Sequence, residues 1–84
     1  MSKIIKDIKV TWTWEGDSYA IKGFNIAITP SGDTPHDNIV VFARAGNVRS
    51  YIFRDVTLDD TKQYTAWVQA IYENSDSDWV SASG

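Results

Sequence analysis

Oxygen-bearing side chains recur at every second position near the end of the chain, where Asn74, Asp76 and Asp78 lie in the segment ENSDSD. This spacing is typical of the first ligands of a calcium loop, because alternate side chains can curl around a hard cation. Trp79 stands where such a loop needs a glycine, and no glutamate follows it. We therefore expect a solvated turn here and no metal site.

The single histidine, His36, lies between Asp33 and Asp37 in the loop-forming segment TPSGDTPHDN. An imidazole beside carboxylates could form a dyad or a metal pair, but one histidine without a second imidazole or a cysteine is a weak ligand set. A Ser-His-Asp hydrolase would also need an oxyanion hole and a pocket, for which a domain of 84 residues has little room. We expect a surface loop, no enzyme and no cofactor.

The stretch YTAWVQA, from Tyr64 to Ala70, predicts a strand that is buried on one face. Tyr64, Ala66, Val68 and Ala70 alternate with polar residues and one tryptophan, which is the period of a β-strand. The polar run ENSDSD then predicts a turn into a last strand that starts at Trp79, so the two segments form a hairpin.

Four more strands are predicted upstream by alternation between turn-forming segments. They cover Ile8 to Trp14, Lys22 to Thr29, residues 38–46 and residues 48–56, the last with Tyr51, Phe53 and Val56 on one face. Leu58, in the polar segment TLDDTKQ, is expected to plug the open end. Short strands with frequent turns predict an all-β, antiparallel two-sheet sandwich, one domain over residues 1–84 with a linker beginning at 81–84.

Composition limits the partners. The net charge is −3, from 8 Lys and Arg against 11 Asp and Glu, which argues against a nucleic-acid or anionic-membrane surface. The start MSKIIKDIKV is too short and too charged for a signal peptide, and no apolar run approaches the ~18 residues of a membrane span. Without cysteine, aromatic and β-branched packing must hold a small core. We expect a monomer as an isolated domain.

Several segments together resemble a fibronectin type III domain. The sequence V-T-W at Val10 to Trp12 resembles the strand B core tryptophan of that family, and GFNIAI resembles its strand C. Leu58 to Tyr64 matches the spacing of the tyrosine corner between strands E and F, and YTAWVQAI followed by SDW matches strands F and G. The resemblance implies that the Tyr64 hydroxyl bonds to loop backbone while its ring packs inside.

The chain departs from the family pattern in two places. Only eleven residues precede Trp12, so strand A must be short, missing, or formed by Ile4 and Ile5 alone. A missing strand would expose the backbone of its neighbour, a known route to pairing with another chain. The turn ENSDSD contains no Arg-Gly-Asp, which leaves integrin-type adhesion through that motif without support.

The alternation that buries Tyr64 and Val68 points Trp67 outward. With Ile71 on the same face and Trp79 on the last strand, Trp67 could form an aromatic platform for a sugar ring or a partner protein. Alternatively, the two tryptophans stack on each other or on basic side chains. Tyr19 and Tyr72 flank loops that should meet at one end of the sandwich and could form a second surface.

Two functions follow as expectations. The first is a non-catalytic structural or spacer module of a larger extracellular or virion protein, because YTAWVQAIYENSDSDWVS resembles fibronectin type III repeats of bacterial secreted enzymes and bacteriophage tail proteins. Its partners would be the neighbouring domains. The second is a recognition module that binds cell-surface carbohydrate or protein through the face around Trp67.

Overall fold

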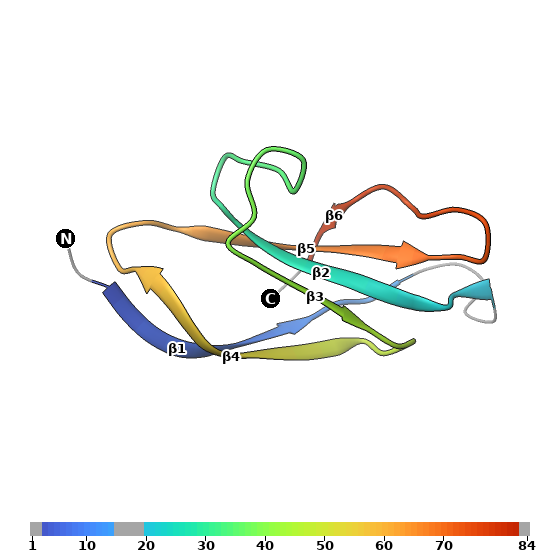
Figure 1. The fold of residues 1–84 in the computed structure, drawn as a ribbon, viewed down its shortest axis with the longest axis horizontal. Helices are drawn as coiled ribbons and strands as arrows, with labels where there is room; N and C mark the ends of the chain where they lie inside the picture. The colour runs from blue at the N-terminus through green and yellow to red at the C-terminus, as the bar shows by residue number, and fades with distance from the viewer. Residues whose placement is uncertain (1–2, 15–19, 83–84) are drawn as a thin grey trace.

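The computed structural model describes residues 3–14 and 20–82, which form an all-β, antiparallel two-sheet sandwich (Figure 1). The strands are β1 (Lys3–Thr11), β2 (Gly23–Pro30), β3 (Val41–Ala45), β4 (Ser50–Asp59), β5 (Tyr64–Ile71) and β6 (Val80–Ser81). β1 and β4 form one sheet, and the other has the order β3-β2-β5-β6. The predicted fold class is confirmed. Within the described residues there is no helix long and apolar enough to cross a membrane.

The register between β2 and β5 places the apolar sides of both strands on the inner face. Ile26 pairs with Val68 and Phe24 pairs with Ala70, and all four are buried. Because side chains alternate across a strand, a slip of one residue would turn this whole set outward. The predicted buried side of the segment from Tyr64 to Ala70 is therefore confirmed.

The core between the sheets is built around Phe24, which is fully buried. The ring centroid of Phe24 lies 5.4 Å from that of Trp12 and 5.6 Å from that of Trp14, which meets it edge-on. The Arg49 guanidinium lies 5.1 Å from the same centroid. Tilted and edge-on ring pairs add to the stabilisation that comes from burying the area. Trp12 retains only 4% exposure.

Several predicted strand limits are wrong. The first strand begins at Lys3 and ends at Thr11, so Trp12 and Trp14 lie beyond it, although the Trp12 amide still donates to the Arg49 carbonyl. The strand predicted over residues 38–46 is shorter, from Val41 to Ala45. A side chain can point into the core without belonging to a hydrogen-bonded strand. The apolar alternation therefore continues beyond the last paired residue, and the predicted strand extends too far. The last strand is short, yet the Ala82 amide donates to the Ala66 carbonyl, so regular pairing extends into the predicted linker start.

The turn between β4 and β5 is fixed by Tyr64. Its hydroxyl accepts a hydrogen bond from the Asp59 amide at 2.9 Å while its half-buried ring packs against the core, as the resemblance implied. The Thr61 hydroxyl and amide donate to the Asp59 carboxylate at 2.6 and 2.9 Å, and these bonds lower the pKa of Asp59. Leu58 is buried, but it belongs to β4, which is longer than predicted, and not to a loop.

A β-bulge interrupts the pairing of β1 with β4. Lys6 pairs with Val56 and Ile8 pairs with Phe53, so two residues of β4 face the single residue Asp7. The Asp7 carboxylate accepts the Asp55 amide at 3.0 Å and forms an ion pair with Arg54 at 3.4 Å. The extra residue allows Phe53 and Val56, three positions apart, to share the inner face, as predicted.

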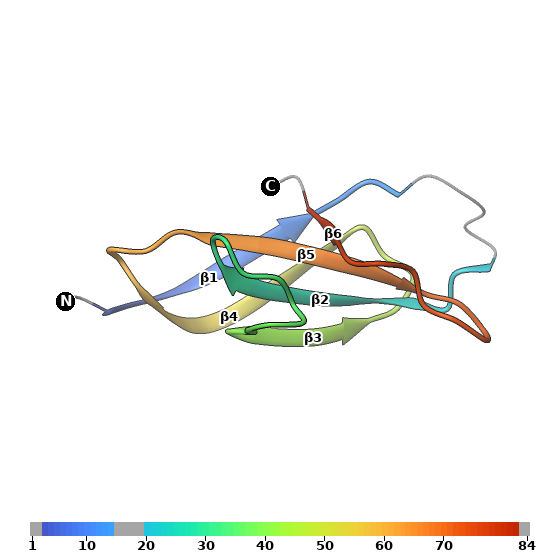
Figure 2. The same ribbon diagram turned by 90° about the horizontal axis from the view of Figure 1, so that it is seen from above.

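The second edge of β1 has no neighbour: across residues 3–14 and 20–82, β1 pairs only with β4 (Figure 2). Ile4 and Ile5 lie within β1 itself, so the idea that they alone form strand A is wrong. Strand A of the fibronectin type III resemblance would lie at this edge. In the described part of the chain it is missing, as one of the three expected alternatives stated.

Replacing Tyr64 by phenylalanine removes one hydroxyl and leaves the Asp59 amide without its acceptor. We expect Tyr64→Phe to lower the free energy of unfolding by about 1–3 kcal/mol, measured by urea denaturation. Tyr51→Phe is the matched control, because the Tyr51 hydroxyl has no hydrogen bond to any described residue. An equal decrease in the free energy of unfolding in the two variants would show that the hydrogen bond from the Asp59 amide to Tyr64 does not stabilise the turn.

Asp55 has a φ of 55°, a left-handed conformation in which a side chain is strained. We expect Asp55→Gly to be more stable than Asp55→Ala by about 1 kcal/mol in the same denaturation experiment. The pair Thr57→Gly and Thr57→Ala, at an exposed regular position of β4, should show the opposite order, since glycine in a strand is less stable than alanine by roughly 0.5–1 kcal/mol. If the alanine variant were the more stable one at both positions, strain at Asp55 would be excluded.

Candidate functional site

Trp67 lies on the outer face of the larger sheet, as predicted, but its indole is half-buried and engaged. Its Nε1 donates to the Thr29 hydroxyl at 2.9 Å, and that hydroxyl donates to the Asp33 carbonyl at 3.1 Å. Trp67 also pairs directly with Ala27, and both Ala27 and Thr29 are fully buried although they face outward. The tryptophan is therefore part of a small outer layer that joins β5, β2 and the loop after β2.

Ile71 shares the outer face of β5 with Trp67, but only 7% of it is exposed. The segment that follows folds back beside it: Ile71 forms an isolated bridge with Asp76, and the Ser77 amide donates to the Ala70 carbonyl. Ile71 therefore offers almost no surface to a ligand. The sequence places it on the correct face but does not show what covers that face.

Trp79 is half-buried and lies just before β6. Among the described aromatic residues, no ring contact joins Trp79 to Trp67, so these two tryptophans do not stack on each other. A binding role for these two residues remains a prediction.

Of the second predicted surface, formed by Tyr19 and Tyr72, the structure describes only Tyr72. Tyr19 lies outside the described residues. Tyr72 is half-buried against the core, and its hydroxyl accepts a hydrogen bond from Trp14 Nε1 at 3.3 Å. That bond ties the end of β5 to the segment after β1. Tyr72 therefore has a structural contact, and its binding role also remains a prediction.

In the loop after β2, polar side chains form hydrogen bonds with other groups of the same loop. Asp37 accepts hydrogen bonds from the Thr34 amide and hydroxyl, and Asp33 accepts one from Asn38. His36 is exposed beside them. In the part of the chain that the structure describes, no group of three His, Cys, Asp or Glu side chains could hold a metal ion.

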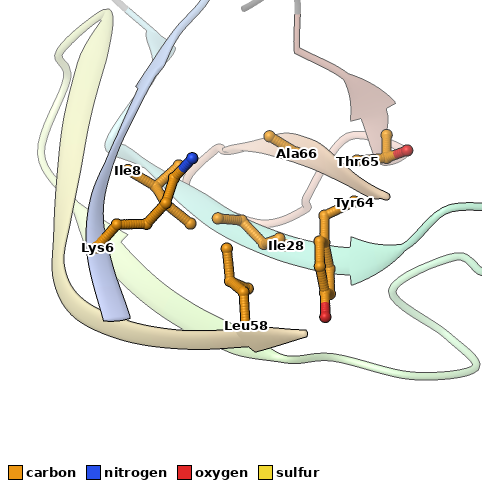
Figure 3. A pocket seen from close by; sticks show the side chains of 7 residues that line it. All are labelled: Lys6, Ile8, Ile28, Leu58, Tyr64, Thr65 and Ala66. Atoms are coloured by element: carbon orange, nitrogen blue, oxygen red, sulfur yellow. The ribbon is translucent and has the colours of Figure 1, made fainter. Parts of the chain in front are cut away.

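A groove that the sequence did not predict lies between the edge of β1 and the start of β5 (Figure 3). Its volume is about 270 Å³, and a second hollow of about 280 Å³ continues it along β1 toward Ala82. The lining residues are Lys6, Ile8, Ile28, Leu58, Tyr64, Thr65 and Ala66. One signal was present in the sequence: a lysine interrupts the inward series Ile4, Lys6, Ile8 and Val10.

Comparisons of the chain with protein-family models, with curated proteins and with solved structures found no match. Function must therefore be inferred from the contacts within this chain.

The hydrogen bond between Trp67 and Thr29 can be measured by a double-mutant cycle. We expect Trp67→Phe and Thr29→Val to show a coupling energy of about 1 kcal/mol in the free energy of unfolding, because either change alone breaks the same bond. Thr29→Ser keeps the hydroxyl, so on that background Trp67→Phe should cost as much as it does in the parent. A coupling energy of zero would contradict the role of this bond.

Proposed function

We propose that this chain is a non-catalytic structural or spacer module of a larger extracellular or virion protein, with the neighbouring domains as its partners. One observation carries the proposal: the polar atoms of four aromatic side chains form hydrogen bonds within the module. Trp67 bonds to Thr29, Tyr64 bonds to Asp59, and Trp14 bonds to Tyr72. These groups link strands and loops and do not converge on one concave site.

We further propose that the module is of the fibronectin type III kind. The hydrogen bond from the Asp59 amide to the Tyr64 hydroxyl supports this, because a tyrosine at that corner is typical of immunoglobulin-like sandwiches. The strand order supports it too. β2, β5 and β6 are neighbours in one sheet, as strands C, F and G are in such sandwiches, and β1 pairs with β4 as B pairs with E.

The second candidate is a recognition module that binds cell-surface carbohydrate through Trp67. The partly exposed indole favours it, because a partly exposed tryptophan on a sheet face can stack on a sugar ring. Its firm hydrogen bond would hold the ring in one orientation. Burial of Ile71 and the lack of a ring contact with Trp79 reduce the apolar area that this face could offer.

An NMR titration of the ¹⁵N-labelled domain with bacterial cell-wall polysaccharide fragments separates the two functions. The signals to follow are the indole N–H groups of Trp12, Trp14, Trp67 and Trp79, together with the backbone amides. A spacer should give no saturable shift at any of them. Saturable shifts confined to Trp67, Trp79 and adjacent strands would overturn the spacer function in favour of recognition. In that case Trp12, which is buried, should remain unshifted and serve as the internal control.

A further inference from the structure

The free edge of β1 can accept another strand. The Trp12 amide donates toward β4, and because backbone groups alternate along a strand, the amide and carbonyl of Lys9 point to the opposite side. No strand of the described chain lies there. A two-stranded sheet is the smallest possible, and a third strand would pair with the amide and carbonyl of Lys9.

The groove beside this edge is shaped for the side chains of such a strand. Ile8 stands on one wall, Tyr64 and Ala66 stand on the other, and Ile28 and Leu58 form the floor (Figure 3). Ile28 is 2% exposed, so the groove reaches the core itself. An added strand would point every second side chain into this space, where apolar side chains would be removed from water.

Lys6 gives the groove a charge. It pairs with Val56, which faces the core, so Lys6 is an inward-facing residue of β1 and lies at the groove wall. Within residues 3–14 and 20–82, the one ion pair joins Arg54 to Asp7, so the Lys6 ammonium has no carboxylate partner there. A cation at the edge of an apolar groove favours an occupant with a carboxylate at the facing position.

The charge of the whole strand favours the same occupant. β1 contains Lys3, Lys6 and Lys9 and a single acid, Asp7, which Arg54 already neutralises, whereas the whole chain has a net charge of −3. In the antiparallel register that places Lys6 opposite Lys6, two copies of β1 would also place Lys3 opposite Lys9, and like charges directly opposite each other destabilise a sheet. An acidic strand from a different protein has no such repulsion.

We propose that the β1 edge and its groove bind an extended segment of a partner protein, in which an inward-facing Asp or Glu meets Lys6 and an apolar side chain lies on either side of it. The segment extends the β1-β4 sheet by strand addition: main-chain hydrogen bonds provide affinity, and the inward side chains provide selectivity. This site lies away from Trp67 and goes beyond the proposed spacer function.

The test uses two blocked heptapeptides, TVTETVT and TVTKTVT, which place valine, glutamate or lysine, and valine inward. We titrate each into the ¹⁵N-labelled domain and measure amide shifts, hydrogen exchange and the dissociation constant. We expect the glutamate peptide to bind at least tenfold more tightly than the lysine peptide, with slowed exchange at Lys9 and no shift of the Trp67 indole.

Charge reversal tests the role of Lys6. In Lys6→Glu the preference between the two peptides should invert, and in Lys6→Met it should disappear while the apolar contribution remains. Lys22→Glu, an exposed change outside β1, should leave the preference intact. A thermal melt of each variant establishes that it is folded. If Lys6→Glu does not fold, Lys6→Met alone tests the role of the Lys6 charge.

Three results would overturn the proposal. They are no slowed exchange at β1 with either peptide at millimolar concentration, equal binding of both peptides, and protection of β1 that rises with protein concentration alone while sedimentation shows a dimer. The last result would identify a second copy as the occupant. None of them bears on the glycan titration, so failure here is distinguishable from failure of the spacer function.

Discussion

The pairing of β2 with β5 is the constraint on which the rest of the structure depends. It runs from Gly23 opposite Ile71 to Pro30 opposite Tyr64 without a break in register. This one alignment sends Phe24, Ile26 and Val68 into the core and sends Thr29 and Trp67 to the outer face. Both layers of the molecule, the core and the small outer layer under the indole, follow from the same register.

The opposite sheet, which has two strands among the described residues, is less regular, since a bulge interrupts their pairing. The bulge at Asp55 lets β4 supply Phe53 and Val56 to the core, and Asp7 satisfies the amide that the bulge releases. The strand β1 contributes Val10 to the core, and among the described residues it pairs along one edge only, with β4. An inward lysine beside the other edge is one way in which proteins prevent indiscriminate strand pairing, and the same charge makes pairing selective.

A small domain without disulfides has few ways to fix its loops, and here polar atoms on large side chains fix them. Tyr64 secures the turn before β5, Tyr72 secures the segment after β1, and Trp67 secures the loop after β2 through Thr29. Each ring contributes buried area while its polar tip satisfies a donor or acceptor that would otherwise be desolvated. This double use of aromatic residues explains why a chain rich in tryptophan and tyrosine can be structural.

The sequence by itself determined the order of the strands and the inner face of β5, because these depend on local alternation with a period of two. The corner at Tyr64 was implied by the resemblance to fibronectin type III domains. Tertiary structure alone decided which strands pair. It alone decided that Leu58 belongs to β4, that Ile71 is covered and that Trp67 bonds to Thr29. It also decided that β1, within the described residues, pairs only with β4 and borders a groove. Local periodicity gives the direction of a side chain. What lies in that direction depends on residues far away in the chain, whose placement is settled only when the whole core packs.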